Sequence, residues 1–542
     1  HNPNSTVREA LQFSAYLRQP ASVSKAEKDL FVEKVLHLLE MEDISDALVG
    51  SSETGIGLSM EERKRLTIGV ELVAKPKVLF LDEPTSGLDA QASFSIVRFL
   101  RKLTQEGQSV LCTIHQPSSM LFEQFDQLLL LAPGGNMVYF GDLGPRCETI
   151  INYFESHGAN PCPHDANPAE YILDVVGAKG KIDWPDTFRN SQLAADERNR
   201  LTEVLESHRS DGQSNVSGDP DEHKEFALGY FEQCRHVVKR NYVSYWRDPE
   251  YNLNRFLLQF MVAIILGLCF LRLGHGTADL QNRVMVIFQT TVMGILIINQ
   301  VQPQLVAWRT WFSREEASGM YDWKAFTTGM LVTEIPYVIA SATVFFLILY
   351  WFVNLADESA RVGYFFIVLV AFYLYSMSFG FMVASFSPSA VVASLVNPFP
   401  TSILALFCGV TIPFPQMPAF WRRWLYWANP YHYYIEGVIA NDLHDTKITC
   451  KDTEYLQFTP PDGNTCYEYA KEFLSVGPGY IRDLNATGTC DYCPYKVGQE
   501  FTDALEWSVD NKWRNFGILF VFIGFNTFML CLGLKYYRAN KR

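Results

Sequence analysis

The chain has 542 residues, of which 48% are hydrophobic and 14% aromatic, against 19% charged. It carries 45 lysines and arginines and 59 acidic residues, which give a net charge of −14. This length exceeds what one hydrophobic core organises, so we expect several domains. An acidic balance with no basic tract excludes nucleic acid as the expected partner. Hydrophobic runs after Asn254 are long enough to cross a bilayer, so part of the chain is expected to be embedded in lipid.

The first residues predict two helices. Thr6 caps the first, over 6–17, with Glu9 three residues beyond it as in a capping box. The second is expected over 24–41, and its apolar side is formed by Leu30, Val32, Val35, Leu36 and Leu39. Both patterns are typical of amphipathic helices that pack against a core.

A short apolar run over 77–81 stops at two acids, Asp82 and Glu83. This pattern predicts a buried strand with both carboxylates at its end. In phosphoryl-transfer ATPases the first such acid holds Mg²⁺ at the β- and γ-phosphates, and the second polarises the attacking water. A strand that ends in an ordinary acidic turn has the same sequence, so these two acids alone do not decide the function.

The residues that follow favour the ATPase. Ser86-Gly87-Leu88-Asp89 resembles the D-loop of ABC-type ATPases. His115, which ends the apolar run 109–114, resembles their switch histidine, whose imidazole contacts the γ-phosphate. Three motifs in this order indicate an ABC nucleotide-binding domain, with ATP and Mg²⁺ as cofactors and the two preceding helices as its helical subdomain.

The ABC signature is a Leu-Ser-Gly-Gly-Gln loop that opens a helix, whose dipole and free N–H groups receive the partner domain's γ-phosphate. The matching residues here are Leu58, Ser59, Met60, Glu61 and Glu62, and Arg63-Lys64-Arg65 follows. Side chains in place of both glycines hinder the approach to phosphate, and the carboxylates repel it unless the basic residues compensate. A working signature that tolerates substitution is the alternative. We expect a degenerate signature and a site that hydrolyses ATP poorly.

A phosphate loop of the form Gly-x-x-x-x-Gly-Lys-[Ser/Thr] is absent from the sequence. Its backbone cradles the phosphates of the nucleotide, so this chain alone lacks that part of an ATP site. In ABC ATPases the loop precedes the helical subdomain. The missing piece is therefore expected upstream of His1, in a longer protein.

The rest of the chain predicts a membrane protein. We expect a partial α/β nucleotide-binding domain over 1–190, an acidic linker over 191–225 and a basic amphipathic helix over 226–250 on an inner membrane surface. Five spans are expected within 251–411, and 513–542 holds a sixth span and a basic cytosolic tail. The predicted spans of this all-α domain are 254–271, 284–301, 327–353, 364–386, 390–410 and 513–536.

Residues 412–512, between the fifth and sixth spans, form the expected extracellular segment. It contains a group of four cysteines, Cys450, Cys466, Cys490 and Cys493. We expect two disulfides in an oxidising compartment, with three pairings open and a zinc site as the alternative. The sequon that begins at Asn485 is expected to be glycosylated there.

The chain as a whole resembles the G-type ABC transporters, and most closely the fungal pleiotropic drug resistance exporters. The segments that carry this resemblance are 57–76, 81–89, 113–118, 139–144, 167–171, 314–321 and 429–431. The resemblance implies ATP-driven export of amphipathic or hydrophobic drugs, azoles or toxins across the plasma membrane. It implies a multi-pass protein with its ATPase and C-terminus in the cytosol, paired with an upstream half of the same transporter or with a partner half-transporter.

The same resemblance assigns roles inside the membrane domain. Arg314, Glu315 and Glu316 lie between spans two and three, in the inner loop that transmits ATPase closure in this family. Glu334 is an acid inside the third span, which makes it a functional candidate, and an acid held by neighbouring backbone is the alternative. The residues expected to line a substrate path are Phe288, Asn299, Glu334 and Phe407.

Three other functions remain open. A phospholipid or sterol translocase has the same architecture, and nothing in the spans separates it from a drug exporter. A homodimeric half-transporter is disfavoured because the degenerate signature would damage both of its sites. An ATP-gated channel or a non-transporting regulator is disfavoured because it has no need of Glu83 and His115.

Overall fold

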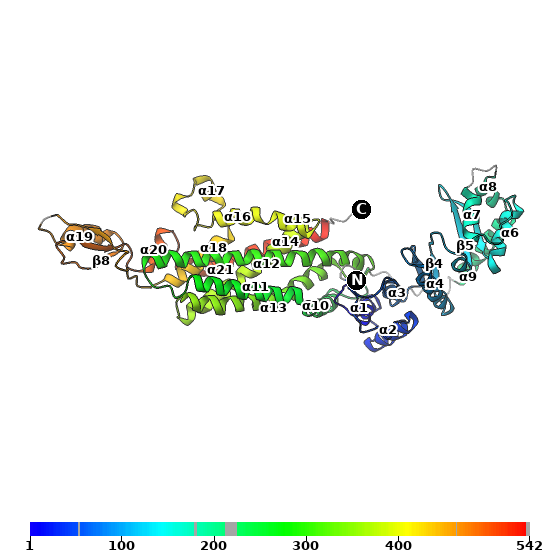
Figure 1. Ribbon diagram of the computed structural model, residues 1–542, viewed down its shortest axis with the longest axis horizontal. Helices are drawn as coiled ribbons and strands as arrows, with labels where there is room; N and C mark the ends of the chain where they lie inside the picture. Colours follow the sequence, from blue (N-terminus) through cyan, green and yellow to red (C-terminus); the bar gives the residue numbers. More distant parts are fainter. Residues whose placement is uncertain (52–54, 178–181, 212–224, 462, 538–542) are drawn as a thin grey trace. The chain divides into compact units, whose positions relative to one another are not determined.

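The computed structural model describes residues 1–51, 55–177, 182–211, 225–461 and 463–537. The chain separates into two compact units, His1–Gly229 and Tyr230–Arg542. The first unit mixes helices and strands, and the second is largely helical (Figure 1).

The first unit follows the predicted α/β pattern. Its helices are α1 (Val7–Arg18), α2 (Lys25–Leu39), α3 (Met60–Leu72), α4 (Ala90–Gln105), α5 (Ser119–Phe122), α6 (Glu148–Ser156), α7 (Pro168–Gly177), α8 (Trp184–Arg189) and α9 (Gln192–Asp211), with a 3-10 turn, η1 (Pro145–Cys147). Its strands are β1 (Gly50–Ser51), β2 (Ile56–Gly57), β3 (Val78–Leu81), β4 (Ser109–Cys112), β5 (Gln127–Ala132) and β6 (Asn136–Asp142).

The predicted helix starts are confirmed. Thr6 and Glu9 form a capping box at α1, and Ser24 with Glu27 forms another at α2. These side chains satisfy backbone N–H groups that have no partner within the first helical turn. Leu30 differs from the prediction, because its side chain is 72% exposed while the other expected apolar residues of α2 are buried.

The strands β3 and β4 are parallel neighbours, with Leu81 opposite Cys112, and this register places the residues after each strand at one edge. Leu79 is buried, but Val78 and Phe80 are 44% and 72% exposed. The expectation of a strand buried on both faces is therefore met on one face only. Within the described residues these two strands form a two-stranded sheet, and no further strand is paired to it.

The expected linker over 191–225 begins as a helix. α9 covers Gln192–Asp211, although Leu201 and Leu205 on it are exposed. Its alanines, leucines, glutamates and arginines favour helix without much burial. Residues 212–224 of the expected linker lie outside the described part of the chain.

The second unit is a bundle of long helices with a small extension (Figure 1). Its helices are α10 (Tyr230–Trp246), α11 (Pro249–Cys269), α12 (Thr277–Ala317), α13 (Trp323–Val353), α14 (Ser359–Phe386), α15 (Ala390–Val396), α16 (Pro398–Leu406), α17 (Ala419–Trp424), α18 (Pro430–Leu443), α19 (Cys466–Val476), α20 (Gly498–Ala504) and α21 (Lys512–Tyr536). The shorter elements are η2 (Phe414–Gln416), η3 (Val509–Asn511), β7 (Leu456–Phe458), β8 (Tyr480–Ile481) and β9 (Cys490–Cys493).

Five described helices are long and apolar enough to cross a membrane: α11, α12, α13, α14 and α21. The fifth predicted span, 390–410, is divided into α15 and α16. The division falls at Asn397, immediately before Pro398, which has no backbone N–H and therefore removes one helical hydrogen bond. Five of the six predicted spans are therefore long helices, the fifth is a shorter apolar stretch, and the count of six crossings stays a prediction.

The predicted disulfides form between Cys450 and Cys493 and between Cys466 and Cys490. The Cys466–Cys490 bond joins α19 to β9 of a three-stranded sheet of order β7-β9-β8, and the Cys450–Cys493 bond ties the segment before β7 to the other end of β9. In Figure 1 this extension, labelled α19 and β8, lies beyond the end of the bundle that carries α20. Among the described residues no group of three histidine, cysteine or acidic side chains could hold a metal ion, so disulfides replace the zinc alternative here.

Candidate functional site

The two acids that follow β3 are held by a threonine that follows β4. The Thr113 hydroxyl donates to Asp82 Oδ1 at 2.6 Å and accepts from the backbone N–H of Glu83 at 2.9 Å. This contact is a direct result of the parallel register, which brings the ends of both strands together. Asp82 and Glu83 are themselves exposed, so both carboxylates are open to a ligand.

Residues 82–89, which we call the acid turn, reverse the chain between β3 and α4. The backbone of Glu83 has φ 47°, and Gly87 has φ 74°. A left-handed conformation costs a residue other than glycine about 1–2 kcal/mol, so the surroundings must hold Glu83 there. Asp89 ends the turn as the N-cap of α4, where its carboxylate accepts from the N–H of Ala92 at 2.8 Å.

His115 lies at the same edge as the two acids, two residues beyond Thr113. Its side chain is exposed, and the next residue, Gln116, has φ 44°. The structure therefore brings the Asp82 and Glu83 pair, the D-loop residues and His115 to one edge of the first unit. Thr113 was not singled out by sequence reasoning, although it belongs to a segment that carries the family resemblance.

The signature residues occupy the start of α3, as expected. Ser59 caps the helix in a box with Glu62, whose carboxylate accepts from the Ser59 N–H at 2.8 Å. Glu61 accepts from the Arg65 guanidinium at 2.7 Å, and Met60 is 57% exposed. Glu61 and Glu62 therefore place two negative charges at the positive N-terminal end of α3, where a helix otherwise favours a bound anion.

Of the basic residues that follow, Arg65 is paired with Glu61, while Arg63 and Lys64 bind backbone carbonyl groups. Arg63 donates to the carbonyl oxygen of Val49 at 2.9 Å, and buried Arg65 donates to that of Leu39 at 2.8 Å. Lys64 is bound to the acid turn. The charge of Glu61 is therefore compensated by Arg65, whereas Glu62 is bound by the Ser59 N–H.

The carboxylate of Asp82 is a suitable ligand for Mg²⁺. Mg²⁺ in phosphate-transfer sites is held by one or two carboxylates together with the phosphates of the substrate. Asp82 supplies one exposed carboxylate, of which Oδ1 is oriented by Thr113. This donor fits the metal.

In the second unit, the expected coupling loop is joined to α10. Arg240 Nη1 lies 2.5 Å from Glu315 Oε1, and Arg240 Nη2 donates to the Tyr321 hydroxyl at 3.1 Å. Tyr321 donates in turn to Glu315. Arg314 is exposed and Glu316 is half-buried at the end of α12. Of the three expected coupling residues, Glu315 thus makes the ion pair, and sequence reasoning named Arg240 only as part of a basic helix.

Glu334 is fully buried and paired with Arg255 of α11. The Tyr251 hydroxyl lies 2.8 Å from each oxygen of this carboxylate, and Arg255 Nε donates to Ser341 Oγ at 3.0 Å. Glu334 is therefore held by side chains rather than by neighbouring backbone, and it faces the bundle interior. An ionisable side chain inside a span normally has such a partner, so the rule that singled out Glu334 also pointed to Arg255.

The other expected path residues lie in different surroundings. Asn299 is exposed, and its Oδ1 accepts from the Asn397 amide at 2.7 Å. Asn397 also exchanges two hydrogen bonds with Gln302, at 2.8 and 2.9 Å, at the break between α15 and α16. Phe288 is half-buried, while Phe407 is buried against Trp421. Their role in a substrate path stays a prediction.

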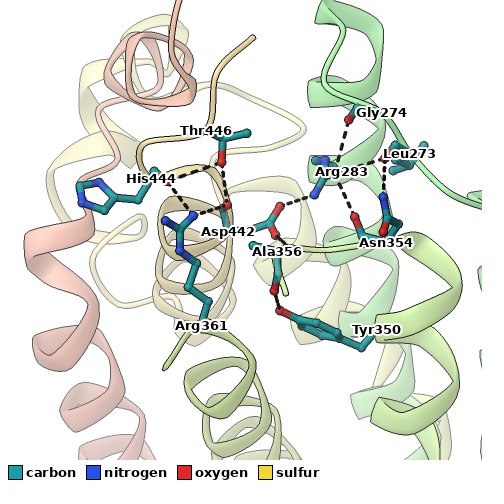
Figure 2. A network of polar contacts seen from close by, with 10 residues as sticks. All are labelled: Leu273, Gly274, Arg283, Tyr350, Asn354, Ala356, Arg361, Asp442, His444 and Thr446. Carbon is teal, nitrogen blue, oxygen red and sulfur yellow. Dashed lines mark hydrogen bonds and ion pairs between the residues drawn. The ribbon is translucent and has the colours of Figure 1, made fainter. Parts of the chain in front are cut away.

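A further polar network fastens α18 to the loops between the long helices (Figure 2). Arg283 of α12 donates to Asp442 at 2.7 Å and to the carbonyl oxygen of Asn354 at 3.0 Å. Asp442 also accepts from the N–H of Ala356 at 2.8 Å. Figure 2 shows Arg361 approaching α18 from the side opposite Arg283. Both charges of the Arg283 and Asp442 pair are buried and paired, as burial requires.

Four protein families match different parts of this chain. An ABC transporter family matches residues 1–86, and two families of ABC-2 type transporters match residues 115–194 and 232–443. A CDR ABC transporter family matches residues 494–542. The chain is therefore an ABC transporter segment, with part of an ATPase followed by a helical transmembrane domain.

Three relatives extend this finding over the whole chain. ABC transporter G family member 11 of Dictyostelium discoideum is 43% identical over 100% of this chain and 38% of its own length. ABC multidrug transporter I of Aspergillus fumigatus is 43% identical over 99% of this chain and 36% of its own length. The brefeldin A resistance protein of Schizosaccharomyces pombe is 41% identical over 100% of this chain and 36% of its own length. The chain belongs to this group of G family ABC transporters and spans 36–38% of the length of these relatives.

Solved structures add little. The ATP-binding cassette MJ1267 of an ABC transporter, in its ADP conformation, is 20% identical over 32% of this chain and 64% of that chain. The TM-score is 0.23, so this likeness carries no argument.

Proposed function

We propose that this chain works within an ATP-driven exporter of amphipathic or hydrophobic small molecules. The observation that carries the proposal is the Asp82, Glu83 and Thr113 arrangement on a chain that also contains five helices able to span a membrane. The names of two relatives, a multidrug transporter and a brefeldin A resistance protein, support drugs as the cargo.

The chemistry follows from the acid turn. Bound Mg²⁺ supplies charge neutralisation at the phosphates, and Asp82 is the residue here that would hold it. Glu83 acts as the general base toward water, and its backbone position is set by the Thr113 hydroxyl. The phosphate loop for this site comes from another segment, because the chain has none. His115 contacts the γ-phosphate.

The two ends of this domain serve two ATP sites. Asp82, Glu83 and His115 act on the nucleotide bound to their own domain, and the start of α3 acts on the nucleotide of the partner half. The acids Glu61 and Glu62 leave the second site able to bind ATP but slow to hydrolyse it. The partner is a homologous half, either upstream in the same transporter or on another chain.

The membrane unit completes the proposal. The five long helices together with the α15 and α16 pair make six crossings of the plasma membrane, with the ATPase and the C-terminus in the cytosol. Residues 412–512 then face outward, which accounts for the two disulfides. Closure of the ATP sites reaches the membrane through the inner loop that contains Arg314, Glu315 and Glu316.

Inside-out vesicles that contain the full-length transporter test this function. We expect ATP-dependent uptake of rhodamine 6G in the wild type and none in the Glu83→Gln variant, with equal amounts of both proteins in the membrane. A fluorescent phospholipid, measured in the same vesicles, tests the translocase alternative. Dye uptake that persists without ATP, or ATP-dependent movement of the phospholipid alone, would contradict drug export.

A further inference from the structure

Lys64 reaches from the signature helix to the acid turn. It lies on α3, and its ammonium group donates to the carbonyl oxygen of Pro84 at 3.1 Å and to that of Ser86. These two carbonyl groups lie on either side of Thr85 in the turn that Glu83 begins. One side chain thus holds the backbone of the turn at two points, from a helix that is 20 residues away in sequence.

The position of Lys64 differs from that of its two basic neighbours. Arg63 binds the carbonyl oxygen of Val49, and Arg65 binds Glu61 and the carbonyl oxygen of Leu39. Burial lowers the pKa of the Lys64 ammonium group, and the nearby charge of Glu83 opposes this shift. Lys64 is therefore the basic residue of α3 that lies close to Glu83.

The acid turn needs an external hold. Glu83 and Gly87 both have positive φ, and a strained backbone of this kind persists only where its surroundings fix it. Thr113 holds the N–H of Glu83 on the strand side, and Lys64 holds the following carbonyl groups on the helix side. Without Lys64, the carbonyl groups of Pro84 and Ser86 lose this donor.

We propose that Lys64 is a positioning residue for ATP hydrolysis, which holds the Glu83 turn in place from the helix that begins with the signature residues. This role rests on the proposed function, in which Glu83 is the general base. Lys64 acts through the backbone of the turn, at the carbonyl groups of Pro84 and Ser86. Its removal is expected to misplace Glu83 while nucleotide binding continues.

Steady-state ATPase kinetics of the full-length transporter test this role. Loss of positioning by a fraction of an ångström to one ångström slows chemistry by up to about 100-fold, so Lys64→Met is expected to lower kcat by about 10- to 100-fold. The KM for ATP is expected to stay within about twofold of the wild-type value, because Lys64→Met does not change how ATP itself is bound. Lys64→Arg, which keeps a donor cation, is expected to restore most of the lost kcat.

Two further variants make the outcome decisive. Lys34→Met removes a lysine from the surface of α2 and is expected to keep wild-type kinetics. Glu83→Gln is expected to be inactive. Wild-type kcat in Lys64→Met, together with an inactive Glu83→Gln, overturns the positioning role and leaves the proposed function standing. Active Glu83→Gln overturns the proposed function itself. A lower melting temperature in Lys64→Met with no rescue by Lys64→Arg also overturns the role, because it indicates a purely structural contact.

Discussion

The carboxylate of Glu334 is bound by the guanidinium of Arg255 at a place where both side chains are 0% exposed. The Tyr251 hydroxyl donates to the same carboxylate. Removing one member of such a pair leaves an unpaired buried charge, which costs about 3–5 kcal/mol. This pair therefore stabilises the contact between α11 and α13 only while both partners are present.

We expect Arg255→Met and Glu334→Gln each to lower the thermal stability of the detergent-solubilised transporter. The double variant Arg255→Met/Glu334→Met is expected to recover most of that loss, because apolar replacements of a buried pair are often nearly neutral. Melting curves from intrinsic tryptophan fluorescence measure the effect. If the loss of thermal stability in the double variant equals the sum of the two single losses, the ion pair does not cause the loss. If it is stable but transports no dye, Glu334 acts in the substrate path.

The contact between Glu454 and the start of α12 predicts a dependence on pH. Partial burial opposes ionisation of Glu454, but hydrogen bonds from the N–H groups of Lys451, Ala278 and Thr277 outweigh it and lower its pKa. A lowered pKa means that the stabilisation is present above the ordinary glutamate pKa of about 4.3 and is lost as the pH falls through the folded value.

Hydrogen exchange of the peptide that begins at Thr277 measures this loss. After correction for the intrinsic rate, we expect wild-type protection to hold down to the ordinary glutamate pKa of about 4.3 and to be lost as the pH falls further, through the lowered folded value. Glu454→Ala is expected to show low protection at every pH. Protection that does not change between pH 6 and pH 3 in the wild type would show that the carboxylate does not hold this helix start.

Peptide mapping without reduction checks the outer extension. We expect linked peptides for Cys450 with Cys493 and for Cys466 with Cys490, as the structure pairs them. Asn485 is exposed and is expected to carry a glycan. Free thiols at all four cysteines together with an unmodified Asn485 would place this segment on the cytosolic side.

Local patterns predicted much of this fold. The capping box at Thr6, the start of the second helix at Ser24 and the ends of β3 and β4 depend on neighbouring residues, so periodicity and cap chemistry locate them. The break at Asn397 was not predicted. The run 390–410 is mostly apolar and carries no charge, and Pro398 alone does not end a span, because membrane helices tolerate proline.

The partners of the candidate residues were harder to predict than the residues themselves. Arg255 lies 79 residues from Glu334, and Thr113 lies 31 residues from Asp82. Such contacts depend on the packing of whole elements, which no single pattern in the sequence encodes. The basic residues after the signature show the same limit, since Arg65 pairs with Glu61 as its charge suggested, while Arg63 and Lys64 bind the carbonyl groups of Val49 and Pro84.

The most direct measurement compares two variants of the full-length transporter in the same assay of ATPase activity and dye export. One carries alanine at Ser59, Met60 and Glu61, and the other carries Glu83→Gln. The account predicts that the alanine variant keeps most of its ATPase activity, because α3 faces the slow site. It predicts that Glu83→Gln loses about 10²–10⁴ in rate, as removal of a general base does. Loss of activity in the alanine variant with activity retained in Glu83→Gln would mean that the two sites are assigned the wrong way round.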